Sequence, residues 1–137
     1  SFVPFSTLTL GGKNYKELQE AKPEKYSKLT EDFVLERTRY IGYDIINGKG
    51  STEFGIGAAC ADICKAIFHD EKRVIPASVL LEGEYGIDGV ACGVPCVIGR
   101  NGIEDIIELE LNDKEKEQMA HTCSVIKDYC ERAEKVK

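Results

Sequence analysis

Four glycines within residues 48–57, Gly-Lys-Gly-Ser-Thr-Glu-Phe-Gly-Ile-Gly, constrain this chain more than any other feature. They interrupt two amphipathic helical patterns, which cover residues 30–47 and 52–69. Gly48 stands where a C-cap glycine belongs, so the first helix is predicted to end at Asn47. The stretch therefore predicts a corner between two helices.

This corner has two possible meanings. Ser51 and Thr52 are good N-cap residues for the second helix, whose first amides carry partial positive charge. Glycine adopts backbone angles that other residues avoid, and it lets a ligand or another backbone come close. The corner is therefore either a plain capped turn or a place that receives a small anionic ligand.

Strand patterns occur on both sides of the helical pair. Their predicted ranges are residues 5–10, 74–81, 90–98 and 103–109. Asn101-Gly102 lies between the last two of these and is a strong hairpin signal. Residues 13–28 are polar and lysine-rich, and they predict a surface excursion with a short helical turn.

A third helix is predicted near the C-terminus. Asn112 and Glu115 have the spacing of a capping box, and an apolar stripe follows at Met119, Cys123, Ile126, Cys130 and Ala133. Helices are thus segregated from an antiparallel sheet. The predicted fold class is α+β, with antiparallel strands and long helices packed on the sheet, in a single domain over residues 1–137.

Composition excludes several classes of protein. The net charge of −6 argues against a nucleic-acid or anionic-membrane surface. No apolar run reaches the roughly 18 residues that span a bilayer, and no signal-peptide pattern opens the chain, so a cytoplasmic location is expected.

The six cysteines occupy apolar positions of the predicted elements, at positions 60, 64, 92, 96, 123 and 130. Their Cys-x3-Cys spacing differs from that of common zinc sites. They are predicted to be buried structural thiols, ahead of disulfides or a metal site.

Few residues have the pattern of a catalytic centre. His69 and His121 have no nucleophile or acid at a motif spacing, and the acidic residues from Glu104 to Glu110 alternate with apolar ones as on a solvated strand. Walker, nucleophile-elbow, zincin and dinucleotide-binding motifs are absent from the sequence. The residue types alone indicate at most part of an active site.

Three segments together resemble the C-terminal half of bacterial L-lactate dehydrogenases. They are residues 42–56 (Gly-Tyr-Asp-Ile-Ile-Asn-Gly-Lys-Gly-Ser-Thr-Glu-Phe-Gly-Ile), 94–103 (Val-Pro-Cys-Val-Ile-Gly-Arg-Asn-Gly-Ile) and 108–115 (Glu-Leu-Glu-Leu-Asn-Asp-Lys-Glu). The resemblance implies the substrate-binding α+β domain that follows a Rossmann domain in this family. It also implies a parent enzyme that interconverts pyruvate and L-lactate with NAD, as a homotetramer.

The resemblance assigns three residues. Thr52 corresponds to the hydroxyl-bearing residue that lines the small-acid pocket, and Ile56 to the apolar residue packed against the nicotinamide ring. Tyr43 matches a position that is phosphorylatable in some bacterial members, although a helix tyrosine is more often a packing residue. The family's dinucleotide loop, two substrate arginines and Asp–His proton-relay pair are expected upstream of Ser1. No catalytic residue is therefore predicted in this chain, which is expected to be inactive alone.

Several alternatives stay open. L-2-hydroxyisocaproate and malate dehydrogenases belong to the same superfamily, and Thr52 argues against the malate branch because a smaller residue is usual there. A non-catalytic oligomerisation module would reuse the fold without the chemistry. A thiol-based metal or redox protein would need exposed cysteines of lowered pKa. Apolar surface is expected to be exposed where a Rossmann domain would dock, and self-association with it.

Overall fold

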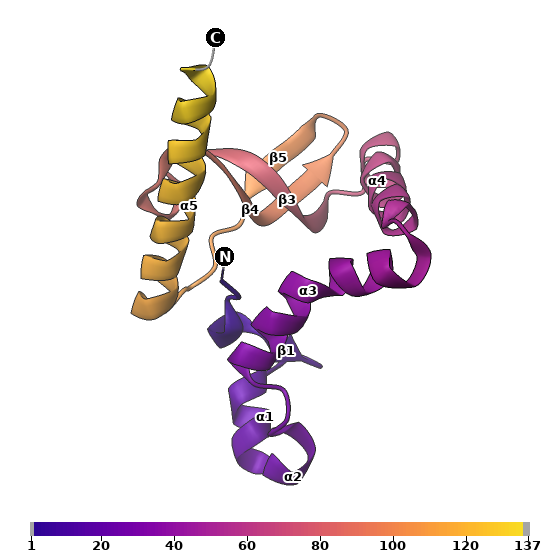
Figure 1. The fold of residues 1–137 in the computed structure, drawn as a ribbon, viewed down its shortest axis with the longest axis vertical. Coiled ribbons are helices and arrows are strands. Elements are labelled where there is room, and N and C mark those ends of the chain that lie inside the picture. The colour runs from indigo at the N-terminus through magenta and orange to yellow at the C-terminus, as the bar shows by residue number, and fades with distance from the viewer. Residues whose placement is uncertain (1, 136–137) are drawn as a thin grey trace. The chain divides into compact units, whose positions relative to one another are not determined.

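The computed structural model describes residues 2–135, which form two compact units (Figure 1). The first unit contains the chain up to Thr52 together with Glu110–Gln118. The second contains Glu53–Leu109 and the chain from Met119 onward. Helix α5, Asp113–Glu134, begins in the first unit and continues in the second.

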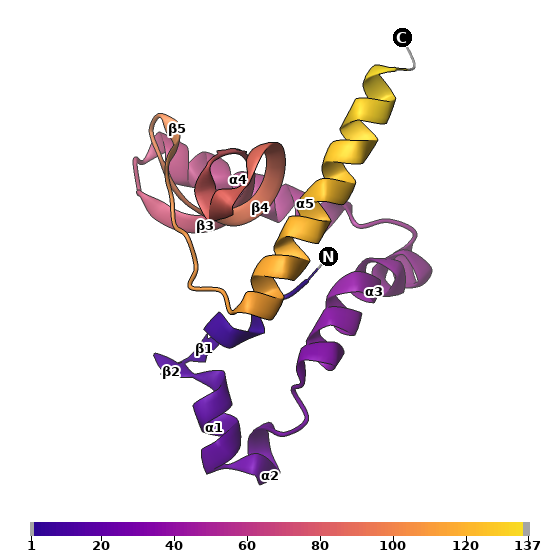
Figure 2. The same ribbon diagram turned by 90° about the vertical axis from the view of Figure 1, so that its left-hand side faces the viewer.

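Short elements open the first unit and lead into one long helix. In order they are the 3-10 turn η1 (Phe5–Thr7), strands β1 (Thr9–Leu10) and β2 (Lys13–Asn14), and helices α1 (Tyr15–Ala21), α2 (Pro23–Tyr26) and α3 (Glu31–Lys49) (Figure 2). Tyr15 is buried between Phe5 and Tyr26, with ring centroids 5.9 and 5.8 Å apart in edge-to-face contacts. Its hydroxyl donates to the Tyr26 carbonyl at 3.0 Å. This aromatic cluster holds the short elements together.

The predicted strand over residues 5–10 is wrong for its first half. Phe5–Thr7 is a 3-10 turn, and only Thr9–Leu10 pairs as a strand, with β2. The Pro4 carbonyl accepts bonds from both the amide and the hydroxyl of Thr7, at 3.2 and 2.9 Å, and these bonds stabilise the turn. The predicted helical turn within residues 13–28 is confirmed, and Pro23 divides it into α1 and α2.

Helix α3 begins as predicted and ends later than predicted. The Thr30 hydroxyl caps it by accepting from the Phe33 amide at 3.2 Å. Gly48 was the expected C-cap, but it lies inside the helix. Gly50 ends the helix instead, because its φ of +89° is the left-handed conformation that turns the chain, and its N–H reaches the Ile46 carbonyl at 2.7 Å.

The second unit contains helix α4 and the main sheet. Its elements are α4 (Glu53–Phe68), β3 (Arg73–Glu82), the 3-10 turn η2 (Glu84–Gly86), β4 (Asp88–Gly99), β5 (Gly102–Ile106) and the later part of α5. The three strands form an antiparallel sheet of order β3-β4-β5. Gly99 pairs with Gly102 across the predicted Asn101-Gly102 hairpin, which is confirmed.

Strand β5 is shorter than the predicted range 103–109. It ends at Ile106, and Tyr85 from η2 contacts the residues that follow. The Tyr85 hydroxyl donates to the Ile107 carbonyl at 3.2 Å and accepts from the Leu109 amide at 2.8 Å. A side chain thus takes the backbone partners that a neighbouring strand would have taken.

The core of the second unit lies between one face of the sheet and α5, which runs beside the sheet in Figures 1 and 2. Its buried residues are Leu81, Val90, Cys92, Val94, Cys96, Ile98, Met119 and Cys123. The prediction of buried cysteines is therefore confirmed for Cys92, Cys96 and Cys123. It is wrong for the other three cysteines, because Cys60, Cys64 and Cys130 lie on helix faces that no described element covers.

Candidate functional site

Thr52 lines a groove in the first unit. The chain leaves α3 at Gly50 and turns back, so that Thr52 lies beside one face of that helix. The groove has a volume of about 280 Å³ and is lined by Arg39, Gly42, Tyr43, Ile46 and Thr52. Of the predicted site residues, the structure therefore brings Thr52 and Tyr43 to one place.

The groove wall follows from helix geometry. Positions 39, 42, 43 and 46 are three or four residues apart, so their side chains share one face of α3. Between positions 36 and 62, Gly42 and Thr52 alone are half-buried, and all the others are exposed. These two are therefore the least exposed of the five residues that line the groove.

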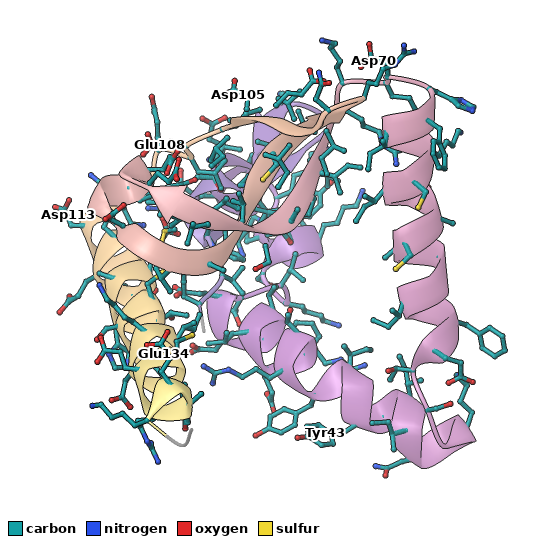
Figure 3. All side chains as sticks on the ribbon, turned by 90° about the horizontal axis from the view of Figure 1, so that it is seen from above. Tyr43, Asp70, Asp105, Glu108, Asp113 and Glu134 are labelled. Atoms are coloured by element: carbon teal, nitrogen blue, oxygen red, sulfur yellow. The ribbon has the colours of Figure 1, made fainter. Side chains whose placement is uncertain are left out.

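Tyr43 lies at the rim. Its side chain is 64% exposed and projects outward from α3 (Figure 3). The ring centroid lies 6.3 Å from that of Tyr40, in a tilted arrangement. The packing interpretation of Tyr43 thus has limited support, since most of the side chain faces solvent.

Ile56 belongs to the second unit, on the first turns of α4. Its side chain is 63% exposed, and a Cβ added at Gly55 or Gly57 would meet no atom within 4 Å. The helix therefore offers an apolar side chain flanked by bare backbone. Such a surface can accept a flat ring.

A second cavity in the first unit is organised by a carboxylate that sequence reasoning did not single out for a site. The cavity measures about 300 Å³ and is lined by Phe5, Ser6, Lys16, Gln19, Glu31, Asn112 and Glu115. Glu115 is 2% exposed and accepts bonds from the Ser6 amide at 2.8 Å, from the Ser6 hydroxyl, and from the Asn112 amide at 3.1 Å. Burial would raise the pKa of this carboxyl, but the bonds from Ser6 and Asn112 and the charge of Lys114 outweigh it, so its pKa lies below the usual value.

Two of the remaining acidic candidates make hydrogen bonds that stabilise the fold. Glu104 accepts from the Lys72 ammonium at 3.0 Å, and Glu108 accepts from the Tyr85 amide at 2.6 Å. His69 and His121 are both exposed.

Across residues 2–135, no group of three or more His, Cys, Asp or Glu side chains could hold a metal ion. No helix in this part of the chain is long and apolar enough to cross a membrane.

Comparison with known proteins identifies the family. The family model of the lactate/malate dehydrogenase α/β C-terminal domain matches residues 6–137. The chain belongs to this family. The predicted family and the predicted α+β fold are therefore confirmed.

Individual members of the lactate/malate dehydrogenase family agree with this assignment. The chain is 41% identical over 127 residues to an L-lactate dehydrogenase of Fusobacterium nucleatum, covering 93% of this chain and 40% of that protein. It is 41% identical over 133 residues to L-lactate dehydrogenase 1 of Staphylococcus aureus strain N315, covering 97% and 41%. The chain thus spans about two fifths of the length of these curated relatives.

Solved structures of the family share the fold. The minor L-lactate dehydrogenase of Enterococcus mundtii superposes with a TM-score of 0.81 at 33% identity, over 93% of this chain and 40% of that one. The malate dehydrogenase of Aeropyrum pernix superposes with a TM-score of 0.75 at 32% identity, over 92% and 40%. Both branches of the family therefore contain this domain.

Proposed function

We propose that this chain is the C-terminal substrate-binding domain of an NAD-dependent L-lactate dehydrogenase, which interconverts pyruvate and L-lactate. The observation that supports this most is the half-buried Thr52 in a small groove, within a chain 41% identical to proteins named L-lactate dehydrogenase. The enzyme would act in the cytoplasm on small 2-oxo and 2-hydroxy acids. The Asp–His pair and the substrate arginines are expected in residues upstream of Ser1, which itself lies outside the described residues.

Thr52 would contact the substrate. Its hydroxyl can donate to a substrate oxygen, and its methyl group limits the space beside it. The exposed Arg39 at the same groove adds positive charge, which favours an anionic acid over a neutral one. Thr52 is thus proposed as a substrate-binding residue.

Ile56 would contact the cofactor. NAD supplies a nicotinamide ring that accepts or donates the hydride when it is bound. The exposed Ile56 side chain and the open space at Gly55 and Gly57 fit a planar apolar ring. In this role Ile56 excludes water from one face of the ring and does no proton chemistry.

The proposal extends to regulation and assembly. Tyr43 is exposed enough for a kinase, and a phosphate there would bring negative charge to the rim of a groove that Arg39 lines. Helix α3 exposes large apolar side chains, namely Phe33, Tyr40, Ile41, Ile45 and Ile46. Such a surface favours burial against other protein, which is consistent with a homotetramer.

The test is an NADH oxidation assay on the protein extended upstream of Ser1, with pyruvate, oxaloacetate and 2-oxoisocaproate as substrates. We expect pyruvate to be reduced and Thr52→Ala to lower kcat/KM about tenfold, because one hydrogen bond to substrate is lost. Ser51→Ala, at an exposed position next to Thr52, is the control and should have little effect. A preference for oxaloacetate would favour the malate branch that the Aeropyrum pernix structure represents. No turnover of any 2-oxo acid would favour the oligomerisation module.

The chain of residues 1–137 should not oxidise NADH with pyruvate by itself. We assign none of its residues a proton-transfer role, and the five residues that line the groove include no carboxylate and no histidine. Activity above that of a mock purification would contradict this part of the proposal.

A further inference from the structure

The dipeptide Asn-Gly occurs twice in this chain, in two different backbone conformations. Asn47-Gly48 lies inside helix α3, whereas Asn101-Gly102 lies at the turn between β4 and β5. Both asparagines are exposed. The two steps therefore share the same reacting groups and the same access to water, and they differ in backbone geometry.

We propose that Asn101 is a site of spontaneous deamidation, at which solvent water converts the side-chain amide into a carboxylate. The backbone nitrogen of Gly102 attacks the side-chain carbonyl carbon of Asn101, and the proton of that nitrogen passes to solvent. The bond from this carbon to the amide nitrogen then breaks, and ammonia leaves with a proton taken from solvent, which closes a succinimide ring. Water opens the ring at either carbonyl carbon and gives aspartate or isoaspartate. Nothing is oxidised or reduced, and water is the co-reactant.

The hairpin tip gives the attacking nitrogen room to move. Gly102 has no side chain and a φ of +90°, and a Cβ built there would meet no heavy atom within 4 Å beyond its chain neighbours. The pair Gly99–Gly102 closes the hairpin, and a register shift between Val97 and Ile98 interrupts the ladder just before it. The tip can thus open locally while the longer β3–β4 ladder stays paired.

Helix α3 protects the other Asn-Gly step. In an α-helix each N–H donates to the carbonyl four residues earlier, so the Gly48 nitrogen is held in the helix and away from the Asn47 side chain. The helix continues to Lys49, and the Gly50 N–H donates to the Ile46 carbonyl at 2.7 Å where it ends. Attack at Asn47 therefore requires the last turn of the helix to open.

Deamidation changes the hydrogen bonds and the charge at the hairpin tip. The Asn101 side chain donates to Oε1 of Glu104 at 3.2 Å, and Oε2 of Glu104 accepts from the Lys72 ammonium at 3.0 Å. A carboxylate at position 101 has no such donor and places a second negative charge beside Glu104. Isoaspartate also lengthens the backbone, because the chain then runs through the side-chain carbon, and this displaces the Gly99–Gly102 pair. Both products should weaken the hairpin.

Timed incubation of the protein extended upstream of Ser1, in mildly alkaline buffer, followed by peptide mass spectrometry, measures both steps in one molecule. We expect Asn101 to deamidate about tenfold or more faster than Asn47, because the reacting atoms meet more readily at the turn than in the helix. In urea-unfolded protein the two steps should react at similar rates, since the difference in backbone geometry is gone.

Three results would overturn the proposal. They are equal rates at the two steps in the folded protein, an Asn101 that reacts in urea but stays unmodified in the folded protein, and a difference in urea as large as in the folded state.

A variant tests the effect on the hairpin. Asn101→Asp carries the charge of one product and should move the midpoint of urea unfolding to a lower concentration. Asn101→Gln keeps an amide donor without the charge, so it is the control and should move the midpoint less. Equal midpoints for the two variants would overturn the effect assigned to the new carboxylate beside Glu104.

Discussion

Glu115 and Ser6 lie 109 residues apart in the sequence and are joined by two hydrogen bonds. The carboxylate accepts from the Ser6 amide through Oε1 and from the Ser6 hydroxyl through Oε2. The same carboxylate closes a capping box with Asn112 at the start of α5. One buried side chain thus ties the N-terminal segment to the helix that begins 107 residues after that serine (113 − 6).

Replacing this carboxylate should destabilise the first unit. We expect Glu115→Gln to lower the free energy of unfolding by about 2 kcal/mol, because charge-assisted bonds to Ser6 and Asn112 become neutral or are lost. The measurement is urea unfolding of the 137-residue chain. Glu117→Gln, two residues further along at an exposed position of α5, is the matched control and should shift the midpoint little.

The same carboxylate should make stability depend on pH. Its pKa in the folded chain lies below the usual value, as burial is outweighed by the donors at Ser6 and Asn112. A depressed folded pKa contributes stability that is present above the unfolded pKa of roughly 4.3 and is lost as pH falls through the folded pKa. Below about pH 4, the wild-type protein should therefore lose more stability than the Glu115→Gln variant does. Thermal unfolding of both proteins across this pH range measures the difference. Parallel curves for the two proteins would contradict this assignment.

Gly99→Ala should weaken the β4–β5 hairpin. A Cβ at Gly99 would lie 2.5 Å from Oε1 of Glu104 and 2.9 Å from Oδ1 of Asp70. Neither carboxylate can move without cost, since Glu104 accepts from Lys72 and Asp70 accepts from the Arg100 amide at 2.9 Å. We expect a loss of about 1–2 kcal/mol in urea unfolding.

Gly93→Ala provides the control for that substitution. Gly93 is in the same strand, and a Cβ there would meet no atom within 4 Å. Alanine at this position should be neutral or slightly stabilising, because glycine in a strand interior is less stable by roughly 0.5–1 kcal/mol. Equal losses for the two variants would mean that crowding at Gly99 is not the cause.

Local signals in the sequence predicted local structure well. The capping box at Asn112 and Glu115 is confirmed by both of its hydrogen bonds, 3.1 and 2.9 Å long. The bond from Ser6 to the same carboxylate has no sequence signal, because nothing in either segment encodes contact across 109 residues. Periodicity likewise identified the apolar face of α4 with Cys60, but periodicity does not say whether another element covers that face.

For the candidate site too, the sequence indicated some residues and gave no signal for those that depend on how the chain folds back. Thr52 was predicted through the family resemblance, and it lines a groove in the structure. Arg39 and Gly42 were not predicted as lining residues, because the groove exists only where the chain turns back toward α3 after Gly50. That turn depends on one glycine two positions beyond the expected cap. The position of a helix end thus decides which residues face the site.

Alanine substitutions at Gly48 and Gly50, the two glycines at the end of α3, should have opposite effects on stability. Gly50→Ala should cost about 1–2 kcal/mol, because φ there is +89° and a Cβ is strained in that region. Gly48→Ala should stabilise the chain by about 0.5–1 kcal/mol, as Gly48 is helical and its surroundings are open. Urea unfolding of the two variants measures both effects. Destabilisation by Gly48→Ala would mean that α3 ends at Gly48 in solution.

The six thiols should fall into two classes of reactivity. Cys60, Cys64 and Cys130 are exposed, whereas Cys92, Cys96 and Cys123 are buried. Burial and the neighbouring Cys92 thiol raise the pKa of Cys123 to about 11, and burial also raises the pKa of Cys96. The thiolate is the reactive form, so at pH 8 these two should react far more slowly than the exposed thiols.

Timed alkylation followed by peptide mass spectrometry measures this difference, and urea-unfolded protein is the control in which all six should react alike. Rapid native labelling of Cys96 or Cys123 would instead favour the thiol-based alternative, since a redox or metal-binding cysteine must be accessible and ionised.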